Sequence, residues 1–404
     1  MTSQLAWWRH RDALPCFLAD LAAAEMRRLR PSAPPLSPGL WPPGLPLDER
    51  GLGLDSLELL ALSSVFSETL HLHCAQAPDT LLRTRTAGAW CDVAEAALDR
   101  SADCISFRSS GSTGVPRPHE HALIHLEAEV AYWAQLLPGR QRVLRMVPCH
   151  HIYGFLFALL LPSSLGIPVE DWRGYSPASL TALFQSGDLV VGSPPFWQAA
   201  ARGAPQGWPA GVIGICSGAP FPDNVALQLQ AAGLDRLIDI YGASETGGIG
   251  WRIAADPSFR LLPGWSRDHD KLSRCDGSLV ITAPDYLRWT TPHRFQLDGR
   301  RDRSVQVGGI NVSLTHVRDV LLRHPDVNDA AVRLMLPNEG ERLKAFVIPR
   351  DPTQAINSLL ASLDAFVTAS LSTPERPRAY QFGSALLVGP SGKPADWPIK
   401  TDNY

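Results

Sequence analysis

Long apolar runs are missing from this sequence of 404 residues. Its most apolar stretch, residues 152–162 (IYGFLFALLLP), is far shorter than the roughly 20 residues that cross a bilayer. Residues 1–17 hold no apolar run long enough for the core of a signal peptide. We therefore expect a cytoplasmic protein without a membrane partner, in which residues 152–162 form a buried helix or strand.

Excess charge of one sign is also missing. The chain has 37 Lys and Arg against 40 Asp and Glu, which gives a net charge of −3, and it contains no block of basic residues. Proteins that bind nucleic acid usually gather Lys and Arg on one face or in one segment. The composition therefore gives no reason to expect a nucleic-acid partner.

Paired cysteines are the third absence. The seven cysteines are scattered, and none has the short spacing of a zinc site or a thiol redox motif. An odd number without pairs predicts buried thiols in a reducing compartment, which agrees with the cytoplasm.

Prolines divide the first hundred residues. Residues 30–46 are rich in proline and must form an extended connector, because proline lacks a backbone donor and disfavours helix before it. Helices are predicted on either side, at residues 13–29 and from Ser56, and a third is predicted at residues 86–98 with Thr86 as N-cap.

The middle of the chain alternates buried strands with helical stretches. Apolar runs at residues 189–194, 211–220 and 236–242 predict the strands of an α/β sheet. After residue 303, strands in 327–335 and 342–349 and helices at 314–323 and 354–371 predict a compact α+β segment. We therefore predict a helical region at 1–100, an α/β core at 101–299 and a small C-terminal domain at 300–404.

Residues 108–118 (RSSGSTGVPRP) form the first stretch that carries chemistry. Small side chains, hydroxyls and many exposed backbone N–H groups let such a loop wrap a polyanionic phosphate. It lacks the Gly-Lys-Ser/Thr ending of a Walker A loop. A flexible surface turn is the alternative interpretation.

Residues 239–250 (DIYGASETGGIG) form the second stretch. A glycine-framed turn after an apolar run places Ser244 and Glu245 at the carboxyl end of a strand, where open α/β sheets bind ligands. One carboxylate beside phosphates suits Mg²⁺, although a solvated turn residue is the alternative. The charged cluster at 297–303 would by itself indicate a solvated linker.

Taken in order, these stretches resemble motifs of the adenylate-forming superfamily, the acyl- and aryl-CoA synthetases and nonribosomal adenylation domains. Ser109–Arg117 resembles its phosphate loop, Tyr241–Glu245 its Tyr-Gly-x-Thr-Glu motif and residues 299–302 its Gly-Arg-x-Asp hinge. Further similar stretches are residues 147–155 (VPCHHIYGF), the gate strand with His151; residues 216–220 (CSGAP), the adenine-side strand; and residues 389–394 (GPSGKP), the C-terminal loop with Lys393.

The resemblance implies a large α/β core with a small mobile C-terminal domain and a two-step reaction that uses ATP and Mg²⁺. A carboxylate attacks the α-phosphate, and a thiol then takes the acyl group from the acyl-adenylate. Lys393 would neutralise charge that builds during the first step, and Glu245 would hold the metal. His151 would lie beside the tunnel for acid and thiol, although a core histidine bonded to backbone is the alternative.

The resemblance also implies two sets of binding residues. Nucleotide-binding positions would be Ser109, Ser110, Gly111, Ser112, Thr113, Gly114, Arg117, Ser217, Gly218, Ala219, Pro220, Asp239, Tyr241, Gly242, Ser244, Arg300 (ribose) and Asp302 (hinge pivot). Acid-pocket positions would be His151, Tyr153, Ser217, Gly218, Gly242, Gly247, Gly248 and Ile249, which are small or aromatic and suit a flat ring.

The sequence departs from the family pattern at several positions. Arg117 occupies a position where the family has lysine, and Ser244 occupies a position where it has threonine. Gln306, in the strand after the hinge, occupies a position where a basic residue is common. The Thr-Gly-Asp motif, whose aspartate holds the ribose, is replaced by residues 289–299 (WTTPHRFQLDG). Ribose binding would then be shared with Asp298 or another group.

The first hundred residues are similar to an acyl carrier protein. Residues 45–72 match the stretch that leads into and along its second helix, with Ser56 at the position that carries phosphopantetheine. Leu57, Leu60, Phe66 and Leu70 would form the apolar stripe of that helix. Asp55-Ser56 is also an ordinary N-cap signal, and a degenerate domain kept for packing or docking is the alternative.

A short chain with residues 147–155 and 305–312 (VQVGGINV) is most similar to the ligases of xanthomonadin and aryl polyene pigment pathways. The resemblance implies activation of a hydroxybenzoate-type acid and its transfer to the thiol of an acyl carrier protein. Transfer to free coenzyme A is one alternative. A nucleotide-binding docking scaffold without turnover is another, against which stand the intact Glu245, Arg300 and Lys393.

Overall fold

The computed structural model describes residues 5–30, 33–34, 36, 39–72, 77–109, 117–176, 181–203, 207–269, 271–301, 304–308, 310–336, 339–340, 342–386 and 397. The chain divides into two compact units. The first holds the described residues as far as Ser109, then Pro118–Thr282 and Trp289–Gln296. The second holds Arg117, Ala283–Arg288 and the described residues from Leu297 onward. The boundaries predicted at residues 100 and 299 stay predictions.

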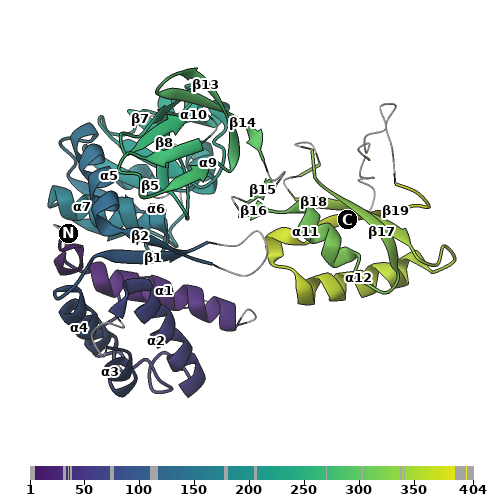
Figure 1. The fold of residues 1–404 in the computed structure, drawn as a ribbon, viewed down its shortest axis with the longest axis horizontal. Helices are drawn as coiled ribbons and strands as arrows, with labels where there is room; N and C mark the ends of the chain where they lie inside the picture. The colour runs from purple at the N-terminus through teal and green to yellow at the C-terminus, as the bar shows by residue number, and fades with distance from the viewer. Residues whose placement is uncertain are drawn as a thin grey trace. The chain divides into compact units, whose positions relative to one another are not determined.

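The first unit begins with a helical region, coloured purple to blue in Figure 1. A short 3₁₀ turn, η1 (Trp7–Arg9), is followed by α1 (Ala13–Leu29), α2 (Ser56–Leu70), α3 (Ala77–Arg83) and α4 (Ala87–Leu98). The helices predicted at 13–29, from Ser56 and at 86–98 are confirmed. The Thr86 hydroxyl accepts a bond from the Ala89 N–H at 3.3 Å, so Thr86 is the N-cap of α4 as predicted.

The buried face of α2 differs in part from the one predicted. Asp55 and Glu58 form a capping box at its start, with both bonds at 2.9 Å. Phe66 and Leu70 are buried as predicted, but Leu57 and Leu60 are 76% and 48% exposed. The buried stripe instead begins at Leu59 and continues through Leu62. Leu57 lies on the opposite side, because two residues turn a helix by about 200°.

A β-hairpin connects this helical region to the rest of the unit. Strand β1 (Cys104–Arg108) pairs antiparallel with β2 (Pro118–Ala122), and Arg108 lies opposite Pro118. Figure 1 shows the hairpin beside the helices, and α2 packs against β1. The residues on either side of the predicted phosphate loop therefore lie next to each other in the hairpin.

The large sheet, most of which belongs to the first unit, is mixed. Its order is β13-β14-β9-β8-β7-β6-β5-β3-β4, and the pairs from β4 to β7 are parallel whereas β7-β8, β8-β9 and β9-β14 are antiparallel. The strands predicted at 189–194, 211–220 and 236–242 are confirmed as β5, β6 and β7. The bounds are β3 (Arg142–Arg145), β4 (Val169–Asp171), β5 (Asp188–Gly192), β6 (Ile213–Ser217), β7 (Arg236–Ala243), β8 (Gly247–Ile253), β9 (Phe259–Leu261), β13 (Asp285–Thr291) and β14 (Arg294–Arg300).

Helices and a smaller sheet complete this unit. Residues 152–162 lie in a buried helical run, so their helical alternative is the correct one. The helical segments are α5 (Leu123–Leu136), α6 (Ile152–Phe155), the π-helical turn η3 (Leu156–Leu160), α7 (Leu161–Leu165), η4 (Thr181–Leu183), α9 (Pro194–Gly203) and α10 (Asp223–Ala231). The small antiparallel sheet contains β10 (Trp265–Asp268), β11 (Lys271–Arg274) and β12 (Val280–Thr282).

The second unit is the predicted α+β segment. Strand β18 pairs antiparallel with β17 and parallel with β19 (Figure 1). Helices α11 and α12 supply Val317, Leu359 and Leu363 to the core of this unit. Its elements are β15 (Val305–Val307), β16 (Ile310–Val312), α11 (Leu314–Leu321), β17 (Val327–Leu334), β18 (Leu343–Pro349), α12 (Ile356–Ser370), η5 (Thr373–Glu375) and β19 (Pro377–Phe382).

The expectations about membrane spans and about cysteines can be compared with the fold. Of the helices in the described ranges, none has the length and apolar character to cross a membrane. The described cysteines are all free thiols. The prediction of buried thiols is confirmed for Cys149 and Cys216, but Cys16, Cys91 and Cys104 are only half-buried, and the prediction is wrong for Cys275, which is exposed. Cys275 follows the end of β11, in a turn that leaves its side chain in solvent.

Candidate active site

The turn between β7 and β8 presents Ser244 and Glu245. A Cβ on Gly242 would lie 2.3 Å from the Gly247 carbonyl oxygen, and Gly247 has φ +70°, so glycine is required at both positions. The buried Thr246 hydroxyl donates to the Gly247 carbonyl at 2.8 Å. The glycine-framed turn predicted from the sequence is therefore confirmed and is rigidly held.

The Glu245 side chain is exposed at the tip of this turn. Within the described ranges, its carboxylate takes part in neither a hydrogen bond nor an ion pair with another side chain. An exposed carboxylate at a fixed backbone position fits the requirement of Mg²⁺, which binds through one or two carboxylates together with phosphate oxygens. Glu245 could hold the metal, and the metal would supply positive charge beside a leaving pyrophosphate.

His121 connects this turn to the hairpin. It lies on β2, and its Nε2 is 2.7 Å from the backbone oxygen of Ser244. A carbonyl can only accept, so Nε2 carries the proton. Burial lowers the pKa of His121 to about 4, so the ring is neutral near pH 7. The strand that follows the predicted phosphate loop is thus bonded to the turn that carries Glu245.

The start of β8 rests on buried polar side chains. Glu129 of α5 accepts a bond from the Gly248 N–H at 3.2 Å, and the Trp265 indole donates to the Gly248 oxygen at 2.7 Å. Arg274 donates to the Thr246 oxygen at 2.7 Å. Burial raises the pKa of Glu129, with the nearby Arg274 opposing that shift. A Cβ on Gly248 would lie 2.2 Å from Glu129 Oε1, so the backbone meets this carboxylate directly.

Strand β6 ends at another predicted set of residues. The Ser217 hydroxyl donates to the Ile240 oxygen of β7 at 2.9 Å, so it joins the two strands. Gly218, with φ +97°, turns the chain into Ala219 and Pro220. The ends of β6 and β7 therefore lie side by side at the carboxyl edge of the parallel strands, as the resemblance requires.

Tyr153 and His151 lie where the gate motif enters α6. The Tyr153 hydroxyl is 2.9 Å from both the Gly192 and the Ile215 carbonyl oxygens, and so bridges the ends of β5 and β6. His151 is exposed directly before α6, with its ring centroid 4.0 Å from that of His150. His151 is thus available to a ligand, whereas the Tyr153 hydroxyl is occupied by the backbone.

A buried charge network holds the gate segment. Asp20 of α1 accepts bonds from the Cys149 N–H at 2.7 Å and from Arg145 Nη1 at 2.6 Å, and it pairs with Arg173 at 2.7 Å. Arg145 also bonds Asp171 at 2.5 Å. Burial would raise the pKa of Asp20, but the two guanidinium groups lower it overall. Helix α1 therefore fixes the residues immediately before His151.

Other predicted residues are buried in the sheet. Asp239 pairs with Arg252 across β7 and β8 at 2.8 Å, and burial raises the pKa of Asp239 with Arg252 opposing. Tyr241 packs edge-on against Phe295. Ile249 is fully buried. These side chains support the turn from within the sheet.

Several predicted residues lie elsewhere. Arg300 is in the second unit and pairs with Asp285 at 3.9 Å, while Ser56 is exposed at the first position of α2. Ser109 and Arg117 lie beside the ends of β1 and β2. The remaining predicted residues, namely Ser110, Gly111, Ser112, Thr113, Gly114, Asp302 and Lys393, fall outside the described residues.

A cavity of about 700 Å³ lies apart from the predicted acid pocket. Trp265, Trp289 and Arg267 line it, and none of the predicted acid-pocket residues is among the described residues on its walls. Arg267 stacks on Trp289 with 4.7 Å between the guanidinium carbon and the ring centroid. This cavity therefore belongs to the antiparallel side of the sheet.

Sequence reasoning did not single out His121, Glu129, Asp20 or Arg145. A signal existed for the last two, because a charged residue inside an apolar run must find a partner if that run is buried. Asp20 stands in FLADLAAA and Arg145 in VLRMV. The partner of each is distant in the sequence, so the pairing itself needed the structure.

Two family models match this chain. The model described as "AMP-binding enzyme" matches residues 69–274, and the model described as "AMP-binding enzyme C-terminal domain" matches residues 316–393.

Curated relatives match almost end to end. A 4-coumarate–CoA ligase of Rhodobacter capsulatus is 40% identical over 94% of this chain and 98% of its own length. Proteins of the same name from Cereibacter sphaeroides and Halorhodospira halophila are 38% and 36% identical, over 88% and 86% of this chain and 86% and 89% of their own.

Solved structures share the fold. The amide bond synthetase McbA of Marinactinospora thermotolerans aligns with a TM-score of 0.60 at 16% identity, over 95% of this chain and 92% of its own. The o-succinylbenzoate CoA synthetase of Bacillus subtilis aligns with a TM-score of 0.59 at 17% identity, over 72% and 67%.

Proposed function

Because the chain belongs to the AMP-binding enzyme family, and is an acid–thiol ligase that forms an acyl-adenylate and AMP, we propose that it activates a hydroxylated aryl acid of the 4-coumarate class. The observation that carries this proposal is the match to 4-coumarate–CoA ligases along almost the whole of both chains. We propose coenzyme A as the thiol acceptor, because those relatives are named for it. The carrier-protein acceptor predicted from the sequence becomes the alternative.

The roles of the site residues follow from their positions. We propose that Glu245 holds the Mg²⁺ of MgATP, since its carboxylate is exposed on a turn that glycines and His121 fix in place. Ser109–Arg117 would surround the phosphates, and Lys393 would neutralise charge between carboxylate and α-phosphate. Arg300 would approach the ribose, and Asp302 would serve as the hinge pivot.

The acid would enter between the gate segment and the start of β8. His151 is exposed there. Gly248 faces the buried Glu129 carboxylate, so it supports the turn and does not itself leave room for the ring. Hydroxybenzoate is the shorter relative of coumarate that the sequence predicts, and the assignment to a pigment pathway stays a prediction. Both acids present the same carboxylate to the nucleotide and differ in the reach of the ring.

An acid-dependent ATP–pyrophosphate exchange assay tests the substrate. The panel contains 4-coumarate, cinnamate, 4-hydroxybenzoate, 3-hydroxybenzoate and octanoate, with Lys393→Ala as the inactive control. We expect 4-coumarate to give the highest kcat/KM. Exchange with octanoate alone would refute the aryl acid, and exchange at the wild-type rate in Lys393→Ala would remove the role given to Lys393.

A second assay separates the acceptors. Enzyme preloaded with acyl-adenylate is mixed with coenzyme A or with a holo carrier protein, and the thioester is measured by mass. Coenzyme A thioester is expected. Product on the carrier alone would overturn the acceptor proposed here and restore the one predicted from the sequence.

One observation favours a further acceptor on the chain itself. Ser56 is exposed at the start of α2, and the neighbouring Leu57 and Leu60 are exposed apolar side chains such as a docking partner would cover. Intact mass after treatment with coenzyme A and a phosphopantetheinyl transferase tests this. A mass gain that is absent in Ser56→Ala would support self-loading, and an unchanged mass would exclude it.

A further inference from the structure

The hairpin that flanks the predicted phosphate loop gathers polar side chains on one face. Cys104 and Ser106 are two residues apart on β1, so their side chains share a face, and Glu120 of β2 lies directly opposite Ser106. His71 reaches this face from the end of α2, which packs against β1. The cluster of His71, Cys104 and Glu120 thus joins three elements of the first unit.

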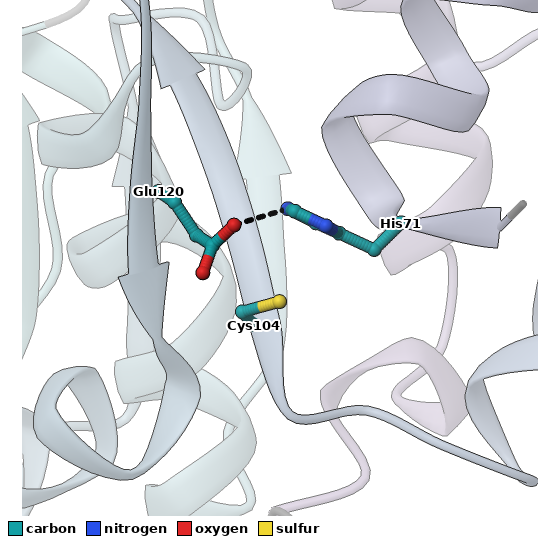
Figure 2. A group of neighbouring side chains, drawn as sticks. All are labelled: His71, Cys104 and Glu120. Carbon is teal, nitrogen blue, oxygen red and sulfur yellow. Dashed lines mark ion pairs between the residues drawn. The ribbon is translucent and has the colours of Figure 1, made fainter. Parts of the chain in front are cut away.

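The ligand-type atoms of these side chains converge. One nitrogen of His71, the sulfur of Cys104 and one carboxylate oxygen of Glu120 all lie within 4.8 Å of one another. Figure 2 shows how these three side chains approach one another. His71 Nε2 is 4.0 Å from Glu120 Oε2 and 3.0 Å from the Ser106 hydroxyl. In a tetrahedral zinc site, ligand atoms are about 3.3 to 3.8 Å apart. Small side-chain rotations would therefore bring all three to one ion.

The backbone at His71 is held in an unusual conformation. Its φ is +53°, in the left-handed region that residues other than glycine seldom adopt. This conformation ends α2 and directs the imidazole toward the hairpin (Figure 2). Arg108 adds a second connection between the same elements, because it pairs with Glu68 of α2.

We propose that His71, Cys104 and Glu120 bind one Zn²⁺. Nitrogen, thiolate sulfur and carboxylate oxygen are the ligand types that zinc takes, and three protein ligands leave the fourth position for water. A cavity of about 500 Å³, lined in part by His71, Ser106 and Glu120, gives the ion an entry path and gives that water a place.

Binding changes protons and hydrogen bonds in a defined way. The Cys104 thiol releases its proton to solvent when sulfur binds the metal, and His71 binds through Nε2 with its remaining proton on Nδ1. The Ser106 hydroxyl then loses its bond to Nε2 and can turn to the metal-bound water. No electron is transferred in this step, and Zn²⁺ keeps its charge throughout.

The consequence is a metal link between α2 and both strands that flank Ser109–Arg117. A ligand that binds the folded chain alone raises its stability by mass action. Zinc would therefore stabilise the hairpin at the base of the predicted phosphate loop, whatever acid the enzyme uses.

Cobalt titration of the full chain tests the site. The experiment uses a Cys275→Ser background, which removes the exposed thiol, under a non-thiol reductant and with Co²⁺ as probe. We expect a thiolate-to-cobalt charge-transfer band that saturates at one ion per chain and disappears when Zn²⁺ is added. Absence of the band in the folded protein overturns the proposal without any further variant.

Matched variants assign the ligands. Cys104→Ser should abolish the band, and Glu120→Gln, at an exposed position that tolerates change, should weaken cobalt binding at least about tenfold. His119→Ala is the control, because the His119 side chain lies on the face of β2 opposite to that of Glu120. Cys74→Ser is the second control, since Cys74 is close to His71 in the sequence. A band that survives Cys104→Ser but is lost in Cys74→Ser would overturn the assignment.

Discussion

The neutral imidazole of His121 donates a hydrogen bond of 2.7 Å to the backbone oxygen of Ser244. This bond crosses from the hairpin that borders the predicted phosphate loop to the turn that presents Glu245. The position of this turn relative to β2 thus depends on the His121 side chain. His121 is a positioning residue.

Replacing His121 by phenylalanine should raise KM for MgATP and lower kcat/KM by about tenfold to a hundredfold. Phenylalanine fills the space but cannot donate to Ser244, so the turn is released, and small misplacements of reacting groups cost this much. Pyrophosphate exchange at varied ATP measures the effect. His119→Ala removes the neighbouring histidine on the same face of β2 but leaves the His121 bond to Ser244 in place, so it should leave the constants unchanged. Equal effects of both variants would refute the positioning role.

His121 should also make the protein less stable in mild acid. Burial lowers its pKa from 6.5 to about 4, so above pH 6.5 both folded and unfolded chains hold it neutral. Between pH 6.5 and 4 the unfolded chain takes up the proton first, and the free energy of unfolding falls by about 3 kcal/mol in total. Urea unfolding at steps of pH measures this fall. His121→Gln should show a shallower decline, and an identical decline would contradict the assignment.

Replacing Asp20 by asparagine should destabilise the first unit by about 3 kcal/mol. Arg145 is 1% exposed and would lose one of its two carboxylate partners, which leaves buried charge without full compensation. Urea unfolding gives the change. Asp12→Asn, at the exposed start of the same helix, should alter stability by no more than about 0.5 kcal/mol.

Adding one methyl group at Gly248 should disable the enzyme. The Cβ of alanine would meet Glu129 Oε1 at 2.2 Å, and a buried carboxylate cannot move aside without losing the Gly248 N–H bond. Acid-dependent pyrophosphate exchange should fall by at least about a hundredfold. Gly44→Ala is the matched control, because nothing lies within 4 Å of its added Cβ. Full activity in Gly248→Ala would show that β8 can shift.

Glu245→Gln should weaken the response to magnesium. The amide keeps the size of the side chain but removes the charge that favours a hard divalent cation. We expect the Mg²⁺ concentration for half-maximal exchange to rise, and kcat at saturating Mg²⁺ to fall about a hundredfold. An unchanged magnesium dependence would place the metal on another carboxylate.

Local patterns were sufficient for most elements of the fold. The capping residue Thr86 and the apolar runs of β5 to β7 are determined by neighbours in the sequence, so they could be predicted. The face of α2 could not, because Leu57 and Leu59 are chemically alike and only packing decides which is buried. Periodicity defines a stripe only when the opposite face is polar.

The residues of the candidate site likewise differ in whether the local sequence could predict them. The glycines around Glu245 could be predicted, since a tight turn requires them locally. His121 and Glu129 act on the turn from distant segments, and each is a single polar residue without a pattern. The zinc ligands proposed above escape sequence reasoning for the same reason, because sheet pairing and a helix end bring them together.

The hairpin pairing of Arg108 with Pro118 has a consequence for how this chain could vary. A loop whose two ends are fixed side by side can grow without moving either strand, and doubling its length costs only about 0.6 kcal/mol in closure entropy. Insertions between these two residues would therefore leave the pairing of β1 with β2 intact. Through the phosphate-binding role proposed for Ser109–Arg117, such insertions would change nucleotide affinity while the strands keep their register.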